Sequence, residues 1–286
     1  MSVPWSRIVR HPASLLVLGF VLAVALYVAT GVLGSQPALR RTPLQPLVVA
    51  LLAAGGVAVY GLFQRKVEQR GNVEYALPGA AGEAGLGAGL GFALFSLSVL
   101  GVWALGDLSF LGLRHGVGQL WGVLAMAIAS GIYEEMIFRG VAFRHLETLL
   151  GSWAALAITS AFFGMAHIAN PGATWFAAFA IAVEAGILLG AAYMFTRRLW
   201  LASGLHAAWN FTQGWIFSVP VSGGKPPEGL VLTSRQGSDL VTGGAFGLEA
   251  SVVALAVATA GGLSLLVLAV RRHGTVAPMW VRARAA

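Results

Sequence analysis

Residues 132–140 have the sequence IYEEMIFRG and place Glu134, Glu135 and Arg139 inside an apolar run long enough to cross a membrane. An ionisable residue near the centre of a membrane helix costs about 2.5–3.5 kcal/mol to insert and usually has a function. Glu135 and Arg139 are four positions apart, so they share one helix face and can form an ion pair. Glu134 lies about 140° from Arg139 around the helix axis. We therefore expect Glu134 to face a partner on another segment.

The composition is that of a membrane protein. Apolar residues make up 57% of the chain and charged residues only 10%, whereas soluble domains have about a quarter charged residues. The formal net charge of +7 does not indicate nucleic-acid binding, because the basic residues stand singly or in pairs at the ends of apolar runs. The sequence has no cysteine, which excludes disulfides, thiolate nucleophiles and cysteine-based zinc sites.

The hydrophobic pattern predicts an all-α, polytopic membrane bundle with about eight transmembrane helices in a single domain, 1–286. The expected spans are 14–33, 44–63, 85–105, 118–144, 153–168, 173–195, 200–219 and 248–270. The first is near 20 residues long and no clear cleavage site follows it, so we expect a retained helix rather than a signal peptide. Residues 220–247 are polar and rich in Gly and Pro, and we expect an irregular, mobile loop.

The distribution of Lys and Arg predicts the orientation. With a cytoplasmic N-terminus, the outer segments hold five of the 18 basic residues: Arg40, Arg41, Arg114, Lys225 and Arg235. The other thirteen then belong to the inner segments, if Arg139 is counted among them: Arg7, Arg10, Arg65, Lys66, Arg70, Arg139, Arg144, Arg197, Arg198, Arg271, Arg272, Arg282 and Arg284. Both termini are therefore predicted to be cytoplasmic.

Two later spans carry polar residues that Glu134 could face. Span 153–168 contains Phe163 and His167, and span 200–219 contains His206 and Asn210. Each pair has i,i+4 spacing, which places its two side chains on one helix face. Three separate spans thus each supply polar groups to a common interior.

These motifs, in this order, resemble those of the CPBP family of intramembrane proteases, which includes the CAAX prenyl endopeptidases of the Ras-converting type. The matching elements are Glu134 and Glu135 to Arg139, Phe163 to His167, and His206 to Asn210. The resemblance covers about 118–217, which we take as the protease core. It implies peptide-bond hydrolysis within or at the membrane by a glutamate-activated water, without an acyl-enzyme.

The residue chemistry fits hydrolysis of an amide. That reaction needs a base for water, an acid for the leaving amine and donors for the oxyanion. We expect Glu134 to act as the base, with His167 sharing the water and shuttling the proton. His206 and Asn210 are expected to donate to the oxyanion. Glu135 and Arg139 would hold the site, and Phe163 is expected to belong mainly to the core.

Three alternatives remain open. One Glu and two His form a known zinc set, so Glu134, His167 and His206 could instead be metal ligands of a metalloprotease. The usual His-Glu-x-x-His motif is absent from the sequence, and we favour a reaction without metal or other cofactor. A proton-coupled transporter also uses membrane Glu and His residues, but no internal repeat supports it. The third alternative is a non-catalytic membrane scaffold.

The expected partners are the lipid bilayer and a protein or peptide substrate. The richness in Ala, Gly, Leu and Val indicates a bacterium with GC-rich DNA, which predicts a location in the bacterial plasma (inner) membrane and makes a prenylated substrate less favoured. Glu184, near the middle of span 173–195, lies outside the three motifs and receives no role.

Overall fold

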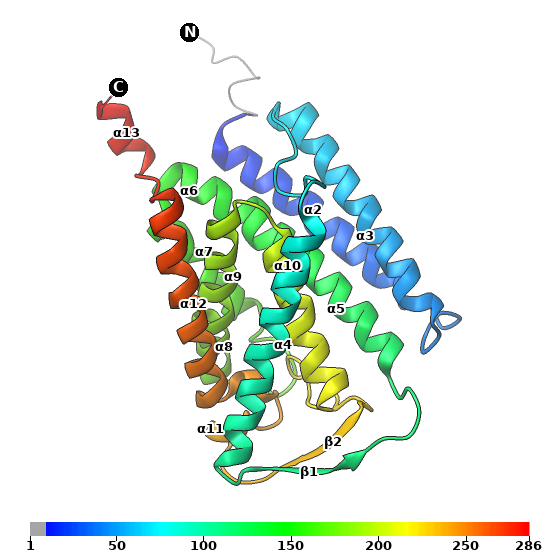
Figure 1. The fold of residues 1–286 in the computed structure, drawn as a ribbon. Helices are drawn as coiled ribbons and strands as arrows, with labels where there is room; N and C mark the ends of the chain where they lie inside the picture. Colours follow the sequence, from blue (N-terminus) through cyan, green and yellow to red (C-terminus); the bar gives the residue numbers. More distant parts are fainter. Residues whose placement is uncertain (1–9, 286) are drawn as a thin grey trace.

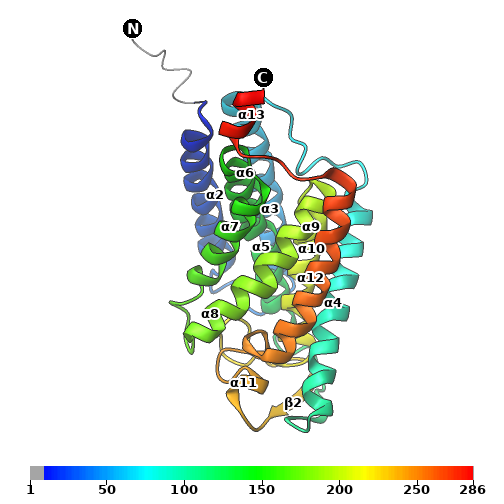
Figure 2. The same cartoon turned by 90° about the vertical axis from the view of Figure 1, so that its left-hand side faces the viewer.

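The computed structural model describes residues 10–285 and is an all-α membrane bundle (Figures 1 and 2). A helix occupies each predicted span: α2 (Pro12–Gly34), α3 (Leu44–Phe63), α4 (Ala80–Ala104), α5 (Leu120–Glu135), α7 (Ser152–Ala166), α8 (Trp175–Ile181) with α9 (Ile187–Thr196), α10 (Trp200–Phe211) and α12 (Val252–His273). Within the described residues, six helical segments are long and apolar enough to cross a membrane. The helix α7 has 15 residues and is shorter, so a count of eight spans stays a prediction.

Several helices contain π-helical turns, which the sequence pattern did not predict. These are η1 (Gln64–Glu68), η2 (Met136–Phe143), η3 (Ala182–Gly186) and η4 (Thr212–Ile216). The segment η2 begins directly after Glu135 and continues α5 into α6 (Arg144–Leu150). Such wide turns disturb the regular backbone ladder and are frequent at functional sites.

The prediction of an irregular loop over 220–247 is wrong in its secondary structure. Residues Val231–Arg235 form β2, which pairs antiparallel with β1 (Leu108–Leu113), and α11 (Asp239–Thr242) follows. The pairing satisfies backbone groups between two segments far apart in sequence, which a local pattern of Gly and Pro does not reveal. Glu249 lies in the short 3-10 turn η5 (Leu248–Ala250), just before α12.

Small residues bring α10 close to both α4 and α5. A Cβ atom added to Gly91 of α4 would overlap the carbonyl oxygen of Leu205 in α10. On the other side, a Cβ atom on Gly131 of α5 would lie 2.7 Å from the Ser203 carbonyl oxygen. Glycine at these positions therefore permits the helix that carries His206 and Asn210 to pack directly against the helix that carries Glu134.

The two ends of the bundle carry different elements. The start of α2 and the C-terminal helix α13 (Met279–Ala285) lie at one end, and the β1–β2 pair lies at the other (Figure 1). At the first end, Arg70 and Arg144 form ion pairs with Glu68 and Glu74. Arg7, one of the predicted inner charges, lies outside the described residues.

Candidate active site

Glu134 lies in the floor of a large cavity. Its Oε1 accepts a hydrogen bond of 2.9 Å from the hydroxyl of Tyr27 in α2. Its side chain keeps 18% of its surface exposed, whereas that of Glu135 is fully buried. Glu134 therefore faces a partner on another helix, as the sequence predicts.

Glu135 joins two of the three motifs. Its Oε1 accepts a hydrogen bond of 3.0 Å from Arg139 Nη1, which is the predicted ion pair, and lies 2.8 Å from His206 Nδ1. Because a carboxylate only accepts hydrogen bonds, the Nδ1 of His206 carries a proton. The Nε2 atom then points toward Glu134, whose Oε2 lies 3.9 Å away. One buried carboxylate thus fixes the orientation of the imidazole.

Arg139 is buried to 1% exposure and has partners on all sides. Its Nη2 donates to the carbonyl oxygens of Ala185 (3.1 Å) and Gly186 (3.3 Å), both within the π-helical turn η3. Its guanidinium carbon lies 4.8 Å from the ring centroid of Phe163. A wide turn frees carbonyl groups from the regular ladder, and here the arginine satisfies them. The residue therefore ties η2, η3 and α7 together.

His167 ends α7 and faces the same cavity as Glu134. Its Nδ1 donates a hydrogen bond of 2.7 Å to the Phe163 carbonyl oxygen, so the Nε2 of the neutral ring is unprotonated and able to accept a proton. The Phe163 ring lies 4.9 Å from the His167 ring and 6.0 Å from the His206 ring. Phe163 is buried in the core, as predicted, and also packs between the two histidines.

Asn210 differs from the expectation. Its Nδ2 donates a hydrogen bond of 3.0 Å to Ser130 Oγ, four residues before Glu134. The His206 Nδ1 is likewise bound to Glu135. The two side chains therefore do not direct all their N–H groups to one open locus, because each uses one donor to hold α10 against α5. Only the second N–H of Asn210 and the Nε2 of His206 are left to face the cavity.

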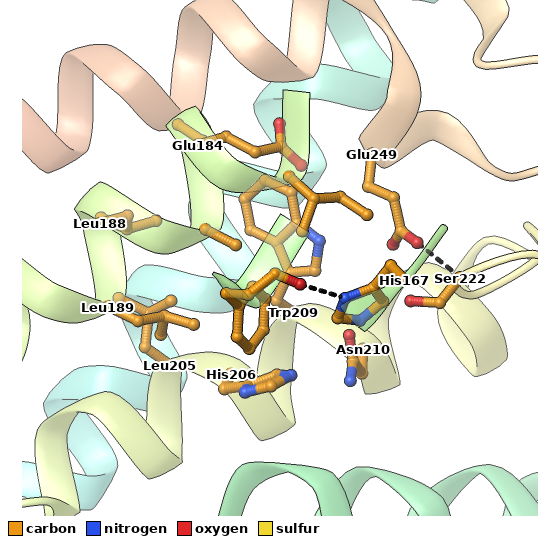
Figure 3. Close-up of a pocket in the computed structure, with 14 residues that line it drawn as sticks. His167, Glu184, Leu188, Leu189, Leu205, His206, Trp209, Asn210, Ser222 and Glu249 are labelled. Atoms are coloured by element: carbon orange, nitrogen blue, oxygen red, sulfur yellow. Dashed lines mark hydrogen bonds between the residues drawn. The ribbon is translucent and has the colours of Figure 1, made fainter. Parts of the chain in front are cut away.

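Two cavities meet at these side chains. The large one has a volume of about 520 Å³ and is lined by Tyr27, Glu134, His167, His206 and Asn210 in its interior. A small one of about 40 Å³ lies beyond His167 and His206 (Figure 3). Glu184 and Glu249 line the small cavity, and Glu249 Oε1 accepts a hydrogen bond of 2.6 Å from the Ser222 backbone N–H. Burial raises the pKa of the Glu249 carboxyl above its ordinary value.

A bound metal ion would require the motif side chains to converge on one point. Among residues 10–285, no group of three or more His, Asp or Glu side chains is close enough together to hold one. Glu134, His167 and His206 line one cavity without forming such a group.

Residues 116–212 match a family model described as type II CAAX prenyl endopeptidase Rce1-like. This match confirms the resemblance to the CPBP and CAAX proteases. The Rce1-like segment contains all three motifs and runs from the turn before α5 to the end of α10. Together with the apolar helices, the match supports the interpretation of the chain as an integral membrane protein with a protease segment of the CAAX type. No curated protein and no solved structure matches the chain.

Three residues near the site were missed by the sequence reasoning. Tyr27 and Glu249 lie outside the Rce1-like segment, and Ser130 lies inside it but belongs to none of the motifs. A signal existed for two of them: Ser130 precedes Glu134 by one helical turn, and Glu249 is a carboxylate at the edge of an apolar run. Tyr27 stands alone in an apolar span, and nothing local distinguishes it from an interfacial tyrosine.

Proposed function

We propose that this protein is an intramembrane endopeptidase that hydrolyses a peptide bond of a membrane-associated or C-terminal-tail substrate by a glutamate-activated water. The observation that carries the proposal is the placement of Glu134. Its carboxylate lies in the floor of the 520 Å³ cavity, beside the oriented imidazole of His206 and in a cavity that His167 also lines. A substrate carbonyl that enters this cavity meets a base and donors together.

The reaction proceeds in two steps in this proposal. Glu134 takes a proton from a water molecule, and the water oxygen attacks the carbonyl carbon to give a tetrahedral oxyanion. When both nitrogens of His206 are protonated, its Nε2–H and the second N–H of Asn210 stabilise that oxyanion. In the second step the proton on Glu134 passes to the Nε2 of His167, which gives it to the leaving amine as the C–N bond breaks and the oxyanion becomes the new carboxyl group. Glu135 and Arg139 do not touch the substrate and hold His206 in place.

A zinc-dependent mechanism is the second candidate, and one observation favours it. Both histidines bind a protein oxygen through Nδ1, namely Phe163 O and Glu135 Oε1, and leave Nε2 toward the cavity. Zinc-binding histidines commonly have this arrangement. The described residues form no group that could hold a metal ion, so we derive no step through a metal and leave the choice to experiment.

The test is cleavage of a library of membrane peptides by the purified protein in detergent. Wild type is compared with Glu134→Gln, each with and without a strong zinc chelator. We expect cleavage that is lost in the variant and is unaffected by the chelator. Cleavage lost in both would support the metalloprotease. Equal cleavage by wild type and Glu134→Gln would overturn the role of Glu134.

The substrate and cellular location extend the proposal. We propose a bacterial plasma membrane location and a substrate that carries no prenyl group, because the composition indicates a GC-rich bacterium. The transporter and scaffold alternatives predict no Glu134-dependent hydrolysis. A proton current through the reconstituted protein that Glu134→Gln abolished would favour the transporter instead.

A further inference from the structure

The mouth of the large cavity is basic, although its floor is acidic. Arg40 and Arg41, between α2 and α3, and Lys225, in the segment after α10, line the cavity that contains Glu134. The outer segments hold only five basic residues by the distribution of Lys and Arg, and three of them line this one cavity. Membrane proteins place few positive charges on the outer face. The gathering of three of these five basic residues at one cavity therefore indicates a function.

The other two outer basic residues have structural partners. Arg114 donates from Nε to the Gly229 carbonyl oxygen, and Arg235 donates from Nη1 to the carbonyl oxygens of Thr242 and Gly244. Arg40 likewise donates from its Nε to a carbonyl oxygen, that of Ser35. Within residues 10–285, none of the five outer basic residues forms an ion pair with an acidic side chain, but only the three that line the cavity are exposed, whereas Arg114 and Arg235 are half-buried. The charges of the three cavity residues are therefore available to a ligand.

The backbone at Arg41 supports a functional role for that side chain. Its φ is +62°, a left-handed conformation that glycine adopts more easily than any residue with a Cβ atom. The Arg41 backbone N–H donates to the Gln45 side chain, which also lines the cavity. An arginine thus stands in a turn where glycine would be favoured, next to the mouth of the cavity.

We propose that the large cavity opens to the extracytoplasmic side and that Arg40, Arg41 and Lys225 bind carboxylate groups of the substrate. This inference rests on the proposed peptidase function and names the substrate class. The negative charge of Glu134 repels carboxylates from the floor, and the three cations attract them to the mouth. The charge arrangement fixes the direction of the substrate: its acidic end stays at the outer face, and the bond to be cut reaches Glu134.

The first experiment measures binding, so that it does not depend on turnover. Fluorescein-labelled Leu-Ala helical peptides with a tail of three Glu or three Gln, each with a free or amidated C-terminus, are titrated with Glu134→Gln protein in detergent. We expect the protein to bind the Glu tail about tenfold more tightly than the Gln tail, as several exposed ion contacts together would give. A preference that follows the free C-terminus instead would identify the terminal carboxylate as the group bound.

The matched variants decide whether the preference comes from the mouth of the cavity. Arg40→Gln, Arg41→Gln and Lys225→Gln are combined in one protein, and Arg65→Gln, Lys66→Gln and Arg271→Gln in the control. Both proteins lose three positive charges, but the control loses them at the opposite end of the bundle. We expect the preference to disappear only in the first. The proposal would be overturned if all peptides bound equally well, or if the control protein lost the preference to the same extent. It would also be overturned if the triple variant kept the preference and anionic lipid alone removed it.

The second experiment tests the side to which the cavity opens. Because the chain has no cysteine, Lys225→Cys and Arg271→Cys each give a single thiol. A membrane-impermeant maleimide applied to intact cells should label Cys at 225 and not at 271. The reverse pattern would overturn the extracytoplasmic opening. If the protein prefers the Glu-tailed peptide but shows no cleavage that depends on Glu134, the peptidase proposal alone is refuted.

Discussion

Tyr27 and Glu134 are joined by a hydrogen bond of 2.9 Å from the tyrosine hydroxyl to the carboxylate Oε1, across 107 positions of sequence. The bond fixes one oxygen of Glu134 and leaves Oε2 on the side of His206. The first membrane helix therefore takes part in the site, although no motif lies in it. This arrangement makes Tyr27 a positioning residue for the proposed base.

Tyr27→Phe should lower kcat/KM about tenfold, which corresponds to about 1.4 kcal/mol for one hydrogen bond to a charged group. In measurements of peptide cleavage, the loss should appear in kcat and not in KM, because the hydroxyl holds the carboxylate in place and does not contact the substrate. Tyr133→Phe is the matched control. Its hydroxyl lies near Thr30 and the Leu52 carbonyl oxygen and not Glu134. If both variants keep wild-type activity, the positioning role is wrong.

Glu135→Gln should destabilise the protein by about 3–5 kcal/mol, because it leaves the buried charge of Arg139 without a counter-charge. The double variant Glu135→Gln/Arg139→Gln should recover part of that loss, which thermal unfolding in detergent would detect. It should nevertheless remain inactive, since His206 no longer has an ionised partner on Nδ1. An active double variant would contradict the role of Glu135 in orienting His206.

Gly91→Val should separate α4 from α10, because the new side chain would overlap the Leu205 carbonyl oxygen. Forced overpacking costs about 1–3 kcal/mol or more, and we expect a lower Tm and lost cleavage. Gly89→Val, on the same helix, is the control, since a Cβ atom there meets nothing within 4 Å. Similar Tm values for the two variants would show that the α4–α10 contact is not tight.

The raised pKa of Glu249 predicts a pH-dependent stability. A carboxyl whose pKa is higher in the folded than in the unfolded state binds its proton more tightly when folded. The free energy of unfolding therefore falls as the pH rises from about 4.3 toward the raised value. Wild-type Tm should fall over this interval more steeply than that of Glu249→Gln. Glu228→Gln, at an exposed glutamate in the segment before β2, should keep the wild-type slope.

The sequence alone determined the class of fold and the groups that bear the chemistry. Continuous apolar runs of about 20 residues cross a membrane as helices, which satisfy all backbone groups within the segment, so the helical regions were predictable from the hydrophobic pattern. The cost of charge in hydrocarbon singled out Glu134, Glu135 and Arg139, and helical spacing alone predicted the Glu135–Arg139 pair. The family match to residues 116–212 covers these same motifs.

Only the tertiary structure decided which atoms meet. The contact of His206 with Glu135, the donation of Tyr27 to Glu134 and the use of Asn210 on Ser130 join different helices, and their relative rotation and depth are not encoded in any one span. The π-helical turns η2 and η3 have carbonyl groups bonded to Tyr60 and Arg139, and β1 pairs with β2, so these elements also have partners distant in sequence. Local patterns fix a residue's face on its own helix, whereas packing between helices decides what that face contacts.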